Sequence, residues 1–251
     1  MEVSEFYPSP RDLIENELRL LEYLLGSTYI AAEHPRFVND AKMYHSQYNY
    51  GRLGFRFVSF LDVAHAGMPR AKGSSKKHGK PKANLRLIIA ALVEQEEKTT
   101  YSNISYALVV TRLRSNHPSI LRKFHFDLTG FDADGQLRRQ PHPLCHLQYC
   151  GEMIPLMGDM GFRAAQLEQM HANLSEPRLF FWPMSLALLI DMALHEFPDP
   201  DSNAFRATPE WRKIVRENEK LLLQRFYEKC VDVIADKGKR KRTLADEFYV
   251  G

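Results

Sequence analysis

The stretch that decides the fold runs from Ile120 to Cys150 and contains two short segments in which apolar and polar residues alternate. The first reads Ile120-Leu-Arg-Lys-Phe-His-Phe-Asp-Leu128, and the second reads His142-Pro-Leu-Cys-His-Leu-Gln-Tyr-Cys150. The segment between them contains Asp134-Gly135, a pair that favours a turn because both residues tolerate the backbone angles of tight turns. The pattern predicts an antiparallel hairpin with a long loop.

The predicted strands each have one apolar and one polar face, because alternate residues of a strand point the same way. In the first strand Phe124 and Phe126 share a face, while Lys123, His125 and Asp127 share the other. The second strand divides similarly, with apolar residues at 145, 147 and 149.

If both apolar faces lie in the core, the numbers of directly paired residues must add to an odd sum. This register places His125, Asp127, His142 and His146 on one face of the sheet. A slip of one residue would separate the polar groups of the two strands.

Imidazole and carboxylate groups on one face can bind a divalent cation, or can act as general base and acid on a phosphodiester. Two histidines four residues apart on one strand are about 13 Å apart, so a shared site needs cross-strand partners such as His125 and His146. Arg178 is a candidate to stabilise a developing oxyanion. The candidate catalytic residues are therefore His125, Asp127, His142, His146 and Arg178. The identity of any metal stays open, and so does the alternative that this polar face is simply solvated.

Further strands are predicted upstream and helices are predicted on both sides. Arg52 to Phe60 and Tyr101 to Leu113 favour strands, and the apolar run from Leu85 to Val93 fits a strand or a buried helix. Helical spacing, capping residues and first-turn prolines predict an amphipathic helix from Pro10 and three later helices. The later helices are expected at Phe162 to Leu174, Ser185 to Phe197 and Thr208 to Ile234.

This order of elements predicts an α+β protein with a mostly antiparallel sheet, an N-terminal helix and a helical C-terminal half. We expect a single domain over residues 1–251. It would comprise an N-terminal helix at 10–36, a β-rich part at 50–155, a helical part at 160–236 and a basic tail at 237–251.

Positive charge is concentrated in two segments without acidic residues. Residues 69–84 carry six Lys or Arg, residues 237–242 carry five, and the remainder of the chain has 23 basic against 31 acidic residues. Basic side chains in a loop suit contact with phosphates, because counterion release needs no fixed geometry. The candidate nucleic-acid-binding residues are Arg70, Lys72, Lys76, Lys77, Lys80 and Lys82. A solvated loop that merely keeps the protein in solution remains the alternative.

Composition and the absence of certain sequence motifs limit which classes of protein fit this sequence. The start of the chain lacks the charged and apolar regions of a secretory signal, and no apolar run approaches the roughly 20 residues of a membrane span. The three cysteines form no CxxC pair, which suits a reducing cytoplasm and small buried thiols. The chain has neither a Gly-x4-Gly-Lys phosphate loop nor a Gly-x-Ser-x-Gly element, so NTPase and serine-hydrolase classes lack a motif.

A set of motifs resembles uncharacterised bacterial proteins, some of them carried near phage or mobile-element genes. The motifs are Phe124-His-Phe-Asp127, His142-Pro-Leu-Cys-His-Leu-Gln148, Glu176-Pro-Arg-Leu179 and a Ser185-opened helix that ends at Glu196-Phe197. The resemblance implies a role in genome conflict such as phage defence, and it assigns no reaction.

Two hypotheses follow from the sequence. The first is a nucleic-acid-acting protein, a metal-assisted or histidine-based phosphodiesterase that uses the hairpin residues and the 69–84 loop. The second is a non-catalytic adaptor or subunit, whose helical half binds a partner protein or a second copy and whose basic segments contact nucleic acid.

Overall fold

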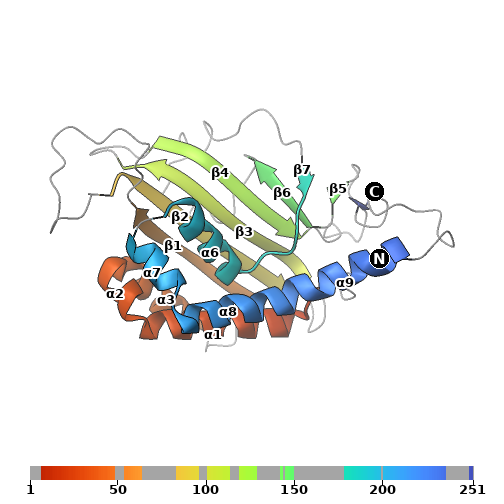
Figure 1. Ribbon diagram of the computed structural model, residues 1–251, viewed down its shortest axis with the longest axis horizontal. Coiled ribbons are helices and arrows are strands. Elements are labelled where there is room, and N and C mark those ends of the chain that lie inside the picture. Colours follow the sequence, from red (N-terminus) through yellow and green to blue (C-terminus); the bar gives the residue numbers. More distant parts are fainter. Residues whose placement is uncertain are drawn as a thin grey trace.

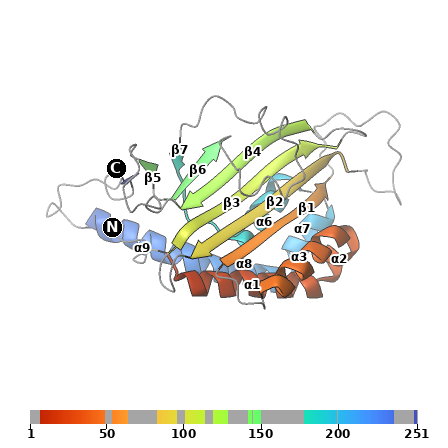
Figure 2. The ribbon, with the colours of Figure 1, turned by 180° about the vertical axis from the view of Figure 1, so that it is seen from behind.

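The protein is built on an antiparallel sheet with helices packed against one face. The computed structural model describes residues 7–48, 54–63, 83–95, 101–113, 119–128, 142–143, 145–149, 178–198, 200–235 and 249–250. The main sheet has six strands in the order β1-β2-β3-β4-β6-β7, and β5 and β8 form a separate two-stranded sheet. The described helices lie on one side of the main sheet, which is in front in Figure 1 and behind in Figure 2.

The strands have the following bounds: β1 Gly54–Val63, β2 Leu85–Gln95, β3 Tyr101–Arg112, β4 Ser119–Leu128, β5 His142–Pro143, β6 Cys145–Tyr149, β7 Arg178–Phe180 and β8 Tyr249–Val250. The helices are α1 Pro10–Gly26, α2 Thr28–Glu33, α3 Pro35–Tyr48, α6 Leu186–Glu196, α7 Pro200–Arg206, α8 Pro209–Asn218, the π-helical segment η3 Glu219–Gln224, and α9 Arg225–Ala235. The predicted α+β class is confirmed.

The predicted strands upstream of the hairpin are confirmed, and the ambiguous apolar run is strand β2. Neighbouring strands β1, β2 and β3 pair along their whole lengths. Their alternate residues, among them Phe57, Leu87 and Leu108, are buried against the helices. The two hydrophobic faces of these strands explain why the β2 sequence is apolar without alternation.

The N-terminal helix predicted over 10–36 is wrong in its extent. Ser9 accepts a hydrogen bond from the Asp12 N–H and begins α1 as expected, but α1 ends at Gly26. The Ser27 side chain then accepts a hydrogen bond from the Ile30 N–H and begins α2. Pro35 begins α3, which continues through residues that the sequence pattern did not identify as helical.

The C-terminal helices follow the sequence more closely. Ser185 caps α6 and Thr208 caps α8, each by accepting a backbone N–H three residues later, as predicted. Helix α7 was not predicted, and β7 is a strand within the part expected to be helical. The helix expected at Phe162 to Leu174 lies outside the described residues. None of the described helices has the length and apolar character needed to cross a membrane.

The helical side of the sheet holds the larger core, in which Trp211 of α8 and Leu189 of α6 are fully buried. A smaller apolar cluster occupies the opposite face, which we call the back face. It comprises Val58, Ile88, Ala90, Leu92, Ala107 and Val109. Cys145 and Cys230 are buried free thiols, as expected for these two, and burial raises the pKa of both; Cys150 lies outside the described residues.

Candidate functional site

The candidate site lies on the back face, where β3, β4 and β6 run side by side. Ser105 of β3 is paired with Asp127 of β4, and Asp127 is paired with position 146 of β6. Position 125 is paired with position 107 on one side and with position 148 on the other. The paired numbers of β4 and β6 add to an odd sum, so the predicted register is confirmed.

Strand β7 continues both sets of paired positions across the sheet. Position 148 is paired with Arg178, and position 146 is paired with Phe180. Directly paired positions share a face of a sheet, so the backbone places the positions of His125, Asp127, His146 and Arg178 together on the back face. Neighbouring strands are about 4.8 Å apart, which puts positions 125 and 178 roughly 10 Å apart.

His142 is not brought to this face by the register of β4 and β6. The sequence pattern treated 142–150 as one strand, whereas β5 contains only His142–Pro143 and pairs with β8 in the separate sheet. A proline has no backbone N–H to donate to a strand ladder, which accounts for the break near Pro143. The prediction that His142 shares a strand with His146 is therefore wrong.

The described side chains form a compact polar cluster of Ser105, His125 and Asp127. His125 Nε2 lies 2.8 Å from Asp127 Oδ1, which is an ion-pair distance when the ring is protonated. The same nitrogen lies 3.0 Å from Ser105 Oγ, within hydrogen-bonding distance. His125 Nδ1 is enclosed and has no hydrogen-bond partner among the described residues. The cluster thus engages one ring nitrogen, and the other is enclosed without a hydrogen-bond partner in the described part of the chain.

Two members of the cluster are buried, and the third, Asp127, is partly buried with 19% of its side chain exposed. His125 is 7% exposed, Ser105 is 7% exposed, and Lys123, which lies on the same face, is 3% exposed. The alternative of a solvated polar face is therefore wrong for these residues. Burial makes the contacts within the cluster stronger than they would be in water, because the local dielectric constant is lower.

The cluster differs from a serine-hydrolase triad in its geometry. In such a triad the serine and the carboxylate contact different nitrogens of the imidazole, so that a proton can pass between them. Here Ser105 and Asp127 both lie against Nε2. The arrangement suits a histidine that acts as a base through Nδ1, with Asp127 stabilising the protonated ring.

A metal site is not formed by the described side chains alone. Within the part of the chain that the structure describes, no group of three metal-ligating side chains occurs. His125 and Asp127 supply two of the usual ligand types, and the backbone places position 146 next to them. A divalent metal therefore remains a prediction.

The basic loop predicted at 69–84, including Arg70, Lys72, Lys76, Lys77, Lys80 and Lys82, falls almost wholly outside the described residues. Its place in the chain is fixed by the connection between β1 and β2, whose ends are joined by a 3.1 Å hydrogen bond from the Asn84 N–H to the Val63 carbonyl. Ser119 lies in the same row of the sheet as these ends, eight residues before Asp127. The loop therefore begins about 26 Å from the cluster along the strands.

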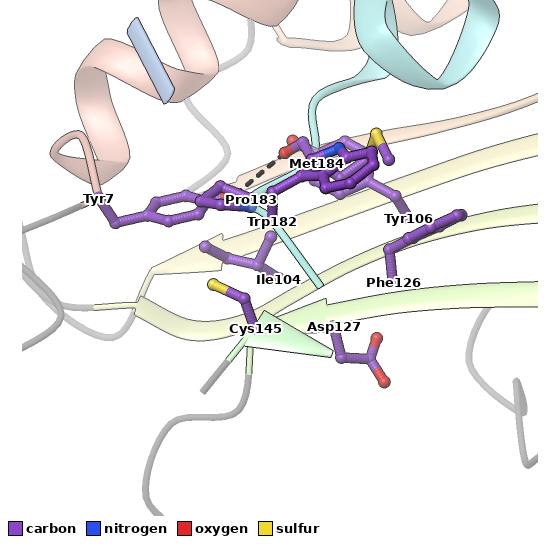
Figure 3. A pocket seen from close by; sticks show the side chains of 9 residues that line it. All are labelled: Tyr7, Ile104, Tyr106, Phe126, Asp127, Cys145, Trp182, Pro183 and Met184. Carbon is purple, nitrogen blue, oxygen red and sulfur yellow. Dashed lines mark hydrogen bonds between the residues drawn. The ribbon is translucent and has the colours of Figure 1, made fainter. Parts of the chain in front are cut away.

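A small pocket lies on the other side of the sheet. Figure 3 shows that its aromatic lining, including Tyr7, Tyr106 and Trp182, points away from the Asp127 carboxylate. Its empty space is about 210 Å³, less than the roughly 300 Å³ at which ligand pockets usually begin. Asp127 is also among the residues that line the pocket, so the pocket and the His125 cluster share this one residue, although its carboxylate points away from the aromatic lining.

Sequence reasoning missed two polar groups that the structure brings out. Ser105 lies in a strand that is otherwise rich in β-branched and aromatic residues, and no motif marks it as functional. Glu17 is fully buried, and burial raises its pKa from 4.5 to about 7, although hydrogen bonds from Tyr106 and Leu186 act in the opposite direction. The position of Glu17 on the apolar stripe of α1 was the available signal.

Comparisons with protein-family models, with curated proteins and with solved structures find no match to this chain. Arguments about function therefore depend on the residues of the site itself.

Proposed function

We propose that the protein is a nucleic-acid-acting phosphodiesterase in which His125 is the general base. The observation that carries this proposal is the 2.8 Å contact between His125 Nε2 and Asp127 Oδ1 on a face that also holds positions 146 and 178. The resemblance of the motifs to proteins found near phage genes favours a role in genome conflict.

In this mechanism the free Nδ1 of His125 removes a proton from the attacking water or hydroxyl. The oxygen attacks phosphorus, the bond to the leaving oxygen breaks, and the imidazolium returns its proton to that oxygen. Asp127 stabilises the imidazolium through Nε2, and Arg178 offsets the negative charge on the phosphoryl oxygens. Nδ1 is enclosed in the structure, so the mechanism requires a step that opens the back face to substrate.

The test is cleavage by the full chain of end-labelled single-stranded RNA, single-stranded DNA and duplex DNA, with and without Mg²⁺ or Mn²⁺. The His125→Gln variant is expected to lose at least about a hundredfold in rate, the contribution typical of a general base. The matched control is His45→Gln, because His45 lies on α3 and its described ion pair is with the exposed Glu22. Unchanged cleavage by folded His125→Gln protein would remove His125 from the mechanism.

A second candidate, a non-catalytic adaptor, is favoured by helix α9. Tyr227, Val231 and Ile234 lie four and three residues apart on one side of this helix and are 52%, 61% and 70% exposed. Helix α9 extends past the end of α1 in both views (Figures 1 and 2). An exposed apolar stripe of this kind is typical of a surface that binds another helix.

The adaptor predicts binding of nucleic acid without turnover. Neutralising Lys76, Lys77, Lys80 and Lys82 to Gln should lower the salt dependence of that binding, since fewer counterions are released. Replacing Tyr227, Val231 and Ile234 with Gln should change the mass of the assembly measured by light scattering. Turnover that depends on His125 would contradict the adaptor.

A further inference from the structure

The arrangement of Ser105, Ala107 and His125 across two strands explains how the imidazole is held. Ala107 is directly opposite His125, and Ser105 is directly opposite Asp127. The small Ala107 side chain leaves space beside the ring, so the ring can reach the neighbouring row that contains Ser105 and Asp127. Residues diagonal to each other across antiparallel strands are within reach of long or aromatic side chains.

The contacts at Nε2 determine which ring nitrogen carries the proton. If Nε2 were unprotonated, this electron-rich nitrogen would lie 2.8 Å from the Asp127 carboxylate oxygen, and the two atoms would repel each other. If Nε2 carries the proton, it can donate a hydrogen bond to Ser105 Oγ, and the negative charge of the Asp127 carboxylate 2.8 Å away favours the proton on this nitrogen.

The surroundings of Nδ1 favour the same assignment. Nδ1 is enclosed without a hydrogen-bond partner among the described residues. A proton on Nδ1 would therefore be a buried donor without an acceptor, which is a costly arrangement.

We propose that Ser105 is a positioning residue that, together with Asp127, holds neutral His125 as the tautomer protonated at Nε2, so that Nδ1 is the reacting atom. This inference rests on the proposed function for its role in cleavage, but the tautomer is a property of the folded chain alone. It assigns a role to a serine that is otherwise an ordinary buried strand residue. It also predicts that substrate approaches the ring from the Nδ1 side.

The test is nitrogen NMR of the full chain labelled at the histidine rings. The His125→Gln variant identifies the His125 signals among the ten histidines by their disappearance. The expected result is a one-bond coupling to hydrogen at Nε2 and an unprotonated shift at Nδ1. A proton on Nδ1, or equal occupancy of both nitrogens, would overturn the proposal even if the protein cleaves nucleic acid.

Substitutions at Asp127 and Ser105 then measure how much each residue contributes to the tautomer of His125. In Asp127→Asn the side-chain amide can donate to Nε2, so we expect a large fraction of the Nδ1-protonated form. In Ser105→Ala we expect a smaller shift toward mixed occupancy and about a tenfold loss of cleavage, against the hundredfold or greater loss in His125→Gln. Ser105→Thr keeps the hydroxyl on a residue suited to a strand and should restore the tautomer. Asp62→Asn, at a surface aspartate bound by Arg86, is the matched control and should leave the His125 signals unchanged.

The two proposals fail in different ways. A chain that shows the Nε2 proton but no cleavage would keep the tautomer assignment and contradict the phosphodiesterase. Unchanged His125 signals in both folded Asp127→Asn and Ser105→Ala would show that neither residue sets the tautomer, and the positioning role would be wrong.

Discussion

Two carboxylates hold helix α6 in place, and their surroundings give their pKa values opposite shifts. Glu17 of α1 accepts hydrogen bonds from the Tyr106 hydroxyl at 2.7 Å and from the Leu186 N–H, the first of α6, at 3.0 Å. Asp191, within α6, accepts two hydrogen bonds of 2.8 Å from the Arg206 guanidinium and one of 2.8 Å from the Trp211 indole. Glu17 therefore has only neutral partners, whereas Asp191 has a cation.

The pKa values follow from this difference. Burial raises the pKa of both groups, but at Asp191 the hydrogen bonds from Arg206 and Trp211 and the charges of Arg206 and His195 outweigh it, and the pKa falls below 3.8. At Glu17 the neutral donors do not outweigh burial, and the pKa rises to about 7. Glu17 Oε2 also has no hydrogen-bond partner among the described residues. Neutral donors alone therefore do not keep the fully buried Glu17 carboxyl charged below about pH 7.

Glu17→Gln is the substitution with the largest expected effect. The effect is a change in the free energy of unfolding that depends on pH. The pKa of Glu17 in the folded state lies above its usual value, so its contribution to stability is complete below pH 4.5 and is lost as the pH rises through about 7. A shift of this size corresponds to about 3 kcal/mol. The free energy of unfolding of Glu17→Gln, relative to that of the unchanged protein, should therefore rise by about 3 kcal/mol across this window. Urea unfolding on both sides of the window measures it.

The control for this prediction is Glu15→Gln on the same helix, where the side chain is 52% exposed and bound to Arg11. Its effect on the free energy of unfolding should change little with pH, because an exposed ion pair contributes little. If Glu17→Gln and Glu15→Gln gave the same flat profile, Glu17 would be ionised at its ordinary pKa and the contrast with Asp191 would disappear.

Asp191→Ala is expected to have the next largest effect. It removes the acceptor of the Arg206 guanidinium and of the fully buried Trp211 indole N–H. The pair is partly exposed, so we expect a loss of about 2 kcal/mol at neutral pH rather than the larger cost of breaking a fully buried pair. Because the folded-state pKa of Asp191 is lowered, this contribution is present above pH 3.8 and is lost as the pH falls further. Thermal or urea unfolding at neutral and acid pH measures both parts.

The exposed Asp232 of α9 offers a comparison for this substitution, since Asp232→Ala should change the free energy of unfolding by less than about 0.5 kcal/mol. An equal, small effect of the two substitutions would mean that Arg206 and Trp211 find other acceptors.

The sequence predicted the elements whose signals are local. The alternation in β4, the caps at Ser9, Ser185 and Thr208, and the parity of the β4 and β6 pairing all follow from neighbours along the chain. The break at Ser27 was missed because a serine that ends one helix can also begin the next. The strand β7 was missed because three residues in a largely helical segment form a strand only when β6 is available as a partner.

The candidate site was predicted in part for the same reason. His125 and Asp127 share a face by their spacing alone, and the odd-sum rule correctly placed position 146 beside them. Position 178 joins them only through the pairing of β6 with β7, and Ser105 only through the pairing of β3 with β4. These contacts join residues far apart in sequence, so no local pattern contains them. His142 was misplaced because the proline beside it was not weighed as a break in the strand.

Tyr106→Phe is expected to have the smallest effect, and it tests whether Glu17 is charged in the folded protein. The Tyr106 hydroxyl is buried and donates to Glu17 Oε1 at 2.7 Å. A hydrogen bond to an ionised acceptor is stronger than one to a neutral acceptor. We therefore expect a loss of about 1 kcal/mol above pH 7, where Glu17 is ionised, and a smaller loss below pH 4.5. Tyr7→Phe is the matched control, because the Tyr7 hydroxyl donates to the neutral Met184 carbonyl and its loss should cost the same at both pH values. If the cost of Tyr106→Phe were also independent of pH, the acceptor at Glu17 would have the same charge throughout, and the raised pKa that separates it from Asp191 would be wrong.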